Sequence, residues 1–208
     1  MTIIDKLATS LNRRDEAPNE ELAATIAGKG DKDAVKELID HLSNKNKNIQ
    51  SDCIKVLYEV GTLRPSLIAE YSNVFIDLLN NKNNRLVWGA MTAIGALTLE
   101  KPESIYANIA LIIDIADKGS VITKDHAVNI LIKLCSIEQY AAHSFSLLVE
   151  QLKNCPTNQL PMYAENAIPV INEQNKSAFV EVLASRLIEI EKDTKRKRVE
   201  KVIKKFYS

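Results

Sequence analysis

The chain has 208 residues, of which 46% are hydrophobic and only 5% aromatic. Its 27 Lys and Arg side chains equal its 27 Asp and Glu side chains, so its net charge does not indicate a nucleic-acid or anionic-membrane partner. No apolar run approaches the roughly 18 residues that a membrane-spanning helix needs, and no apolar stretch near the N-terminus indicates a secretory signal. The three cysteines form no Cys-x-x-Cys pair, which favours reduced thiols in a cytoplasmic protein over a disulfide framework or zinc site.

The sequence repeats itself without a gap. Residues 38–46 align on residues 75–83, which is a shift of 37 residues (75 minus 38), and the same shift carries Ala90 to Ala127 and Ala164. A fixed period of this size is typical of a solenoid, in which each unit buries its apolar face by stacking on its neighbours. The sequence therefore predicts an all-α fold, a right-handed α-solenoid of helical pairs, with the three alanines on the buried face of the second helices.

We expect a single repeat domain, because the array crosses most of the chain. Residues 1–32 are interpreted as an N-terminal cap with segments at residues 3–11 and 19–27, since the repeat register fades there. Residues 33–175 are expected to hold four repeats. Terminal units of a solenoid are atypical because one of their faces meets water instead of a neighbour.

The second copy predicts a helix over residues 67–79, a turn over residues 80–84 and a second helix over residues 85–99. The turn contains four Asn among five residues, and Asn favours turns and caps over helix interiors. The third copy spans residues 106–134, with its break at Gly119 and Ser120.

The fourth copy pairs a helix over residues 145–152 with one over residues 160–171. Pro169 falls inside the latter and should kink or shorten it, because proline lacks the amide hydrogen that a helix interior requires. Residues 176–208 are interpreted as the C-terminal cap, which ends in a basic helix over residues 195–206.

Residues 86–97, Leu-Val-Trp-Gly-Ala-Met-Thr-Ala-Ile-Gly-Ala-Leu, resemble the second helix of a HEAT repeat. The resemblance covers roughly residues 33–175 and implies HEAT-like helical pairs, with an armadillo-like or mixed array left open by the short period. One feature departs from the family, whose members often carry an Asp in the turn and an Arg early in the second helix. These positions hold Asn44, Asn81 and Lys118 in place of Asp, and Gln50, Val87 and Lys124 in place of Arg. The usual Asp–Arg ladder is therefore expected to be missing.

A candidate binding surface lies opposite the buried stripe of the second helices. At about 100° per residue, Trp88 points about 160° away from Ala90. Since second helices of HEAT pairs generally line the concave side, the resemblance implies that such positions form a groove, although packing of Trp88 against the neighbouring repeat remains an alternative. The candidate partner-binding residues are Lys55, Tyr58, Trp88, Thr92, Asp125, Asn129, Ile132, Met162 and Asn166.

No pattern of residues indicates catalysis, a metal site or a cofactor. Equivalent residues of adjacent repeats should lie about 8 to 10 Å apart, too far for shared metal ligation. This distance applies to the recurring aspartates, Asp40, Asp77 and Asp114. The three histidines show no metal-ligand spacing; they are His41, His126 and His143.

The C-terminal residues 192–208 carry eight Lys and Arg against two acidic residues, a charge of +6 (8 minus 2). Their apolar side chains, Val199, Val202, Ile203 and Phe206, recur at helical spacing and predict a helix docked by one face. A solvated capping helix is favoured over a nucleic-acid contact.

Two hypotheses of function follow. The first is a non-enzymatic cytoplasmic scaffold that binds a protein or peptide in its groove, without cofactor, metal or membrane contact. The alternative is a DNA-binding enzyme resembling the HEAT-like alkylpurine DNA glycosylases. Trp88 and the basic C-terminus support the alternative, but zero net charge disfavours it because a phosphate-tracking surface needs a continuous cationic band.

Overall fold

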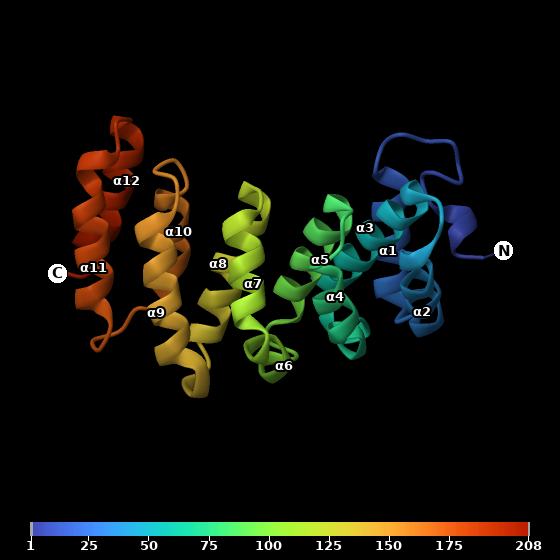
Figure 1. Ribbon diagram of the computed structural model, residues 1–208, viewed down its shortest axis with the longest axis horizontal. Helices are drawn as coiled ribbons and strands as arrows, with labels where there is room; N and C mark the ends of the chain where they lie inside the picture. The colour runs from blue at the N-terminus through green and yellow to red at the C-terminus, as the bar shows by residue number, and fades with distance from the viewer. Residues whose placement is uncertain (1, 208) are drawn as a thin grey trace. The chain divides into compact units, whose positions relative to one another are not determined.

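The computed structural model describes residues 2–207, and these residues form twelve α-helices joined by turns and short 3-10 helices, with no strand among them (Figure 1). The prediction of an all-α fold is confirmed. Contacts between the helices group the chain into two compact units, which meet in sequence at Ala127 and Val128. Within residues 2–207, no helix has both the length and the apolar character needed to cross a bilayer.

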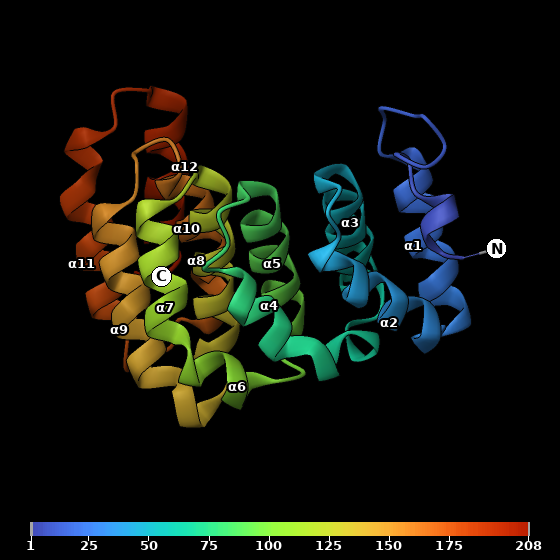
Figure 2. The same cartoon turned by 45° about the vertical axis from the view of Figure 1, so that its right-hand side comes forward.

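The first unit is a stack in which α3 packs between α1 and α5, and these three helices follow one another in Figure 2. Helix α2 packs on α3, and α4 packs on α5. The helices of this unit are α1 (Ala17–Lys29), α2 (Lys32–Asp40), α3 (Lys47–Leu63), α4 (Ser72–Leu78), α5 (Asn84–Leu97), α6 (Pro102–Ala107) and α7 (Ile109–Lys118). Helix α8 (Val121–Cys135) begins in the first unit and ends in the second.

Short polar side chains set the helix starts of the first unit. Asp31 accepts a hydrogen bond from the amide of Ala34 at the start of α2, and Asn46 and Asn83 accept amide hydrogen bonds at the starts of α3 and α5. Such caps satisfy amide groups that have no partner inside the helix. Helix α1 ends at Gly30, whose φ of 68° is the left-handed conformation that favours glycine.

The helix predicted over residues 67–79 is divided in the structure. Two 3-10 helices, Pro65–Leu67 and Ala69–Tyr71, precede α4. The backbone leaves the α-helical region at Ile68 (φ −106°, ψ 0°), whose buried side chain packs where Gly61 lacks a Cβ atom. The third copy is divided in the same way at Asn108, between α6 and α7. Each of these two copies therefore contains more helical segments than a simple pair.

Amide side chains take the place of the missing Asp–Arg ladder. Gln50 donates a hydrogen bond from its Nε2 atom to the carbonyl of Asn44 at 2.7 Å, and its Oε1 atom accepts one from Asn83 Nδ2 at 3.2 Å. Asn44 and Asn81 also accept hydrogen bonds from the amides of Asn46 and Asn83. One neutral link thus joins the turns of two successive repeats.

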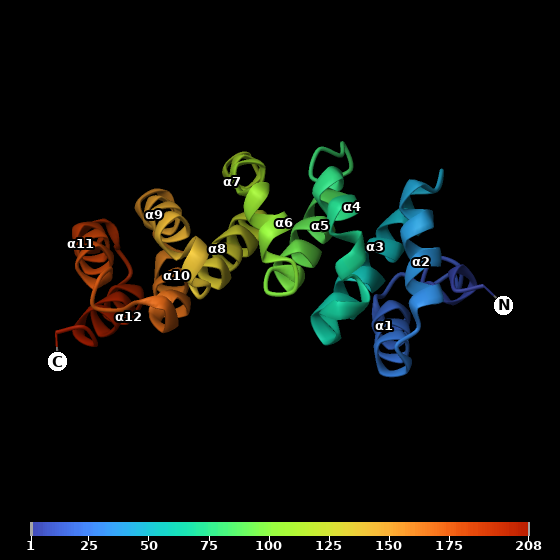
Figure 3. The ribbon, with the colours of Figure 1, turned by 90° about the horizontal axis from the view of Figure 1, so that it is seen from below.

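The second unit contains α9 (Glu138–Asn154), α10 (Leu160–Ala167), α11 (Lys176–Arg186) and α12 (Asp193–Lys204). Helix α9 packs on α11 and α10 packs on α12, so these four helices form two layers (Figure 3). A 3-10 helix, Ile168–Val170, follows α10 directly. The predicted shortening of this helix at Pro169 is confirmed.

The predicted interior positions are buried. Ala90, Ala127 and Ala164 each expose 0% of their surface, as the repeat register requires. Val199, Val202 and Ile203 bury one face of α12, and the ring of Phe206 meets the ring of Phe179 edge to face, with centroids 5.7 Å apart. The prediction of a C-terminal helix docked by its apolar face is confirmed.

Candidate functional site

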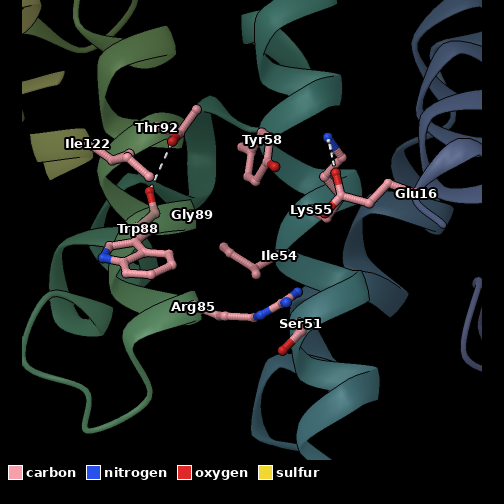
Figure 4. Close-up of a pocket in the computed structure, with 10 residues that line it drawn as sticks. All are labelled: Glu16, Ser51, Ile54, Lys55, Tyr58, Arg85, Trp88, Gly89, Thr92 and Ile122. Carbon is pink, nitrogen blue, oxygen red and sulfur yellow. Dashed lines mark hydrogen bonds and ion pairs between the residues drawn. The ribbon is translucent and has the colours of Figure 1, made fainter. Parts of the chain in front are cut away.

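A hollow of about 260 Å³ lies on α3 and α5 in the first unit, and we call it the α3–α5 hollow. Four of the predicted partner-binding residues, Lys55, Tyr58, Trp88 and Thr92, line it (Figure 4). The full lining is Glu16, Ser51, Ile54, Lys55, Tyr58, Arg85, Trp88, Gly89, Thr92 and Ile122. Side chains from separate repeats therefore share one surface.

The floor of this hollow depends on a close approach of α3 and α5. A Cβ atom added at Gly89 would overlap with the Ile54 side chain, so only glycine lets the two helices come this near. Trp88 precedes Gly89 and is half-buried, with its indole facing the hollow. The Thr92 hydroxyl donates to the Trp88 carbonyl at 2.9 Å and lies 3.0 Å from the ring nitrogen Nε2 of His126.

Lys55 is held by charges inside the hollow. Its ammonium lies 2.8 Å from Glu59, 3.0 Å from Glu16 and 3.2 Å from Glu20, and 5.1 Å from the centroid of the Tyr58 ring. Burial disfavours the charged form, but hydrogen bonds to Glu59 and Glu16 outweigh it and raise the pKa of Lys55. With a side chain only 11% exposed, Lys55 stabilises the wall of the hollow by internal ion pairs.

Burial also raises the pKa of Tyr58, although the nearby Lys55 ammonium opposes this change. Tyr58 therefore stays neutral across the physiological range and presents a phenol to the hollow. A neutral phenol and an indole that line the same hollow suit contact with an apolar or amphipathic group.

A second hollow of about 340 Å³ adjoins the first and shares Glu16, Ser51, Lys55 and Arg85 with it. We call it the N-terminal hollow, because it also involves the segment before α1. Its lining is Ala8, Thr9, Arg13, Arg14, Asp15, Glu16, Asn19, Asn48, Ser51, Asp52, Lys55 and Arg85. We refer to the two adjoining hollows together as the depression.

The other predicted partner-binding residues line neither hollow. Asp125 is half-buried on α8 in the first unit. Asn129 and Ile132 are half-buried on the part of α8 that belongs to the second unit, and on α10 Met162 is half-buried and Asn166 exposed. The structure thus brings four of the nine residues together, and a partner-binding role stays a prediction for all nine.

Sequence reasoning left out several residues of the lining. Arg85 could have been found, because it lies three positions before Trp88 and so shares a face of α5 with it. Ser51 could have been found in the same way, because it lies four positions before Lys55 and so shares a face of α3 with it. Glu16 had no comparable signal, since it precedes the first regular helix and reaches the hollow only through the packing of α1 on α3.

Many basic side chains of the C-terminal segment are engaged within the second unit. Arg198 forms two hydrogen bonds with Glu165, at 2.9 and 2.6 Å, which lower the pKa of that carboxyl group. Lys197 pairs with Asp193 at 2.8 Å. Arg196 donates to the carbonyl of Ile190 and Lys195 to that of Asn158. These contacts support the interpretation of α12 as a capping helix. Within residues 2–207, no three His, Cys, Asp or Glu side chains gather as a metal ion would require.

No protein-family model and no curated protein matches this sequence. Solved structures do match its fold. A designed armadillo repeat protein in complex with the peptide (KR)4 is similar with a TM-score of 0.64 and 15% identity, over 89% of this chain and 85% of that one. A second designed armadillo repeat protein matches with a TM-score of 0.64 and 13% identity, over 97% of each chain.

An engineered protein known from its crystal structure is also similar, with a TM-score of 0.60 and 18% identity over 99% of this chain and 98% of that one. At these identities the similarity is one of fold. The chain therefore has the fold of an armadillo- or HEAT-like helical repeat solenoid.

Proposed function

We propose that this protein is a non-enzymatic scaffold that holds an extended peptide segment of a protein partner in the α3–α5 hollow. The position of Trp88 carries the proposal: it is half-buried and lines the hollow together with Tyr58 of the preceding repeat. Trp and Tyr often dominate binding energy at interfaces, because large rigid rings bury much apolar area at low entropy cost.

The repeat fold supports this proposal in a second way. Stacked second helices present side chains that are far apart in sequence on one surface, and such surfaces are extended enough for a peptide. One designed armadillo repeat protein of similar fold is in complex with a peptide. Asp125, Asn129, Ile132, Met162 and Asn166 are proposed as further contacts within their own units.

Substitution of Trp88 tests the proposal. The immobilised protein is exposed to a library of short peptides, and the retained peptides are identified and measured one by one. Trp88→Ala should weaken the binding of the retained peptides by about 2 kcal/mol, which is about 30-fold in affinity. The melting temperature, followed by circular dichroism, should stay close to that of the wild type. Leu99→Ala is the matched control, because Leu99 is an exposed apolar residue that lines neither hollow.

Two results would contradict the proposal. If Trp88→Ala unfolds the protein, Trp88 belongs to the packing between repeats. If peptide affinity is unchanged, the α3–α5 hollow is not the binding surface. Release of bases from alkylated DNA, with binding measured across salt concentrations, would favour the glycosylase-like enzyme instead.

A further inference from the structure

Two arginine side chains of the depression form no hydrogen bond or ion pair within the part of the chain that the structure describes. Arg14 and Arg85 are exposed and line the N-terminal hollow, and Arg85 also lines the α3–α5 hollow. Among the residues that the structure describes, neither guanidinium group pairs with a carboxylate or donates a hydrogen bond, whereas neighbouring Arg13 forms two hydrogen bonds with Asp15 at 2.9 and 2.8 Å. A guanidinium that stays unpaired at a concave surface can bind an anionic group from outside.

The acidic side chains of the N-terminal hollow are already engaged. Asp52 accepts hydrogen bonds from the Thr9 amide at 2.8 Å and from Asn19 Nδ2 at 2.9 Å. Glu16 pairs with Lys55, and the Arg13 hydrogen bond holds the pKa of Asp15 below its usual value. Asp15 and Glu16 are thus paired with cations, whereas Asp52 is hydrogen-bonded only to neutral groups. The lining carries four cations against three carboxylates, a charge of +1 (4 minus 3), and its unpaired cations are Arg14 and Arg85.

The position of Arg85 joins this charge to the aromatic part of the depression. Arg85 stands one helical turn before Trp88 on α5, and its side chain extends toward Ser51 on α3 (Figure 4). A group bound to the Arg85 guanidinium would lie on the α3 side of the α3–α5 hollow, across from the indole of Trp88 on α5. Arg and Trp are both enriched among the residues that carry binding energy at interfaces.

We infer that the peptide held in the α3–α5 hollow is acidic, with an Asp or Glu carboxylate bound by the guanidinium of Arg85 and an adjacent apolar side chain in contact with Trp88. The planar guanidinium matches a carboxylate through two parallel hydrogen bonds. Arg14 adds a second cation for a neighbouring carboxylate. This inference rests on the proposed peptide-binding function and specifies the chemistry of the partner.

A continuous phosphate backbone fits the same surface less well. Asp52 lines the N-terminal hollow and accepts hydrogen bonds only from neutral groups, so its charge would repel a chain that carries a charge at every nucleotide. A peptide can place single carboxylates at the free arginines and uncharged residues beside the acidic side chains.

The test uses three pools of short peptides of equal length. Alternate positions are fixed as Asp or Glu in the first pool, Lys or Arg in the second and Asn or Gln in the third, and the remaining positions vary over uncharged residues. Binding to the full chain is measured by retention and by the fluorescence of Trp88, the only tryptophan. We expect the acidic pool to be retained about tenfold or more over the other two.

Arg85→Gln should reduce retention of the acidic pool about tenfold, and Arg85→Glu should abolish its preference over the basic pool. Lys36→Glu is the matched control for a change of net charge, since Lys36 is exposed on α2 and lines neither hollow. Circular dichroism of each variant establishes that it is folded. Arg14→Gln should have a smaller effect than Arg85→Gln, because Arg14 does not line the α3–α5 hollow.

The outcomes separate this inference from the proposed function. Equal or better retention of the basic or amide pool, with dependence on Trp88, overturns the acidic preference and leaves peptide binding standing. Retention of the acidic pool without dependence on Arg85 also overturns it. If no pool is retained through Trp88, both statements fail. Binding of single-stranded DNA through Arg85, without the acidic pool, would identify a nucleic-acid surface instead.

Discussion

Lys55 shows how a predicted contact residue can have a structural task. Its ammonium is surrounded by the carboxylates of Glu16, Glu20 and Glu59, and such partners compensate the cost of removing a charge from water. Since the pKa of Lys55 is raised, its contribution to stability is complete below its unfolded pKa of about 10.4 and is lost only as pH rises through the higher folded value. Deprotonation of Lys55 therefore does not weaken the wall of the hollow near neutral pH.

The cysteines should react slowly in the folded protein. Burial, followed by the nearby Asp52 and Glu37 carboxylates, raises the pKa of Cys53 to about 12, and burial raises that of Cys135 to about 12. Because the thiolate is the reactive form, both thiols should be almost inert near neutral pH. Alkylation followed by mass spectrometry should modify half-buried Cys135 before fully buried Cys53, and both rapidly after denaturation. Fast modification of native Cys53 would contradict its burial.

At the scale of helices, the link through Asn83 should contribute measurable stability. Asn83 caps α5 through the Arg85 amide at 3.1 Å and also donates to Gln50, so Asn83→Ala removes two hydrogen bonds at once. We expect a loss of about 1 to 2 kcal/mol in the free energy of unfolding, measured with denaturant.

Asn80→Ala is the matched control for this change, because Asn80 is exposed in the same turn and its side chain caps no helix. A double-mutant cycle with Gln50→Ala isolates the bond between repeats. Equal losses of unfolding free energy for Asn83→Ala and Asn80→Ala would show that the link contributes no measurable stability.

The buried face of α8 should not accept a larger side chain. Ala127 is fully buried, so Ala127→Leu should overpack the interior and cost roughly 1 to 3 kcal/mol. The control is Ala110→Leu on the exposed face of α7, which should change the melting temperature little. An unchanged melting temperature for Ala127→Leu would contradict the repeat register that placed Ala127 in the interior.

At the scale of the molecule, a repeat stack should transmit damage mainly to neighbouring helices. Gly89→Ala forces a Cβ atom into Ile54 and should cost roughly 1 to 3 kcal/mol. Hydrogen exchange followed by mass spectrometry should show the largest loss of protection in α3, α4 and α5, because α5 packs on α3 and α4.

Gly28→Ala provides the control, since a Cβ atom at this exposed position of α1 would meet nothing within 4 Å. It should leave exchange unchanged or slow it slightly, because alanine favours helix more than glycine does. If Gly89→Ala lost protection equally in every helix, the chain would unfold only as a whole. That result would contradict a stack in which each helix depends mainly on its neighbours.

The sequence by itself determined the features that depend on local chemistry and on the period. The shift of 37 residues placed Ala90, Ala127 and Ala164 in the interior, and all three are buried. The Asn-rich turn and Pro169 marked helix ends, because their effects on the backbone act within a few residues. Helical period and local breaks were therefore sufficient for the class of fold.

Only the tertiary structure decided what the candidate surface contains. Trp88 was predicted from its place on α5, but Glu16 joins it through the packing of α1 on α3, and this contact has no counterpart in the repeat pattern. Lys55 forms ion pairs and the Arg85 side chain forms none among the described residues, because this depends on which carboxylates come near each cation in space. The periodic pattern specifies which face of a helix is buried, whereas the charge balance of a hollow is set by segments that meet only after folding.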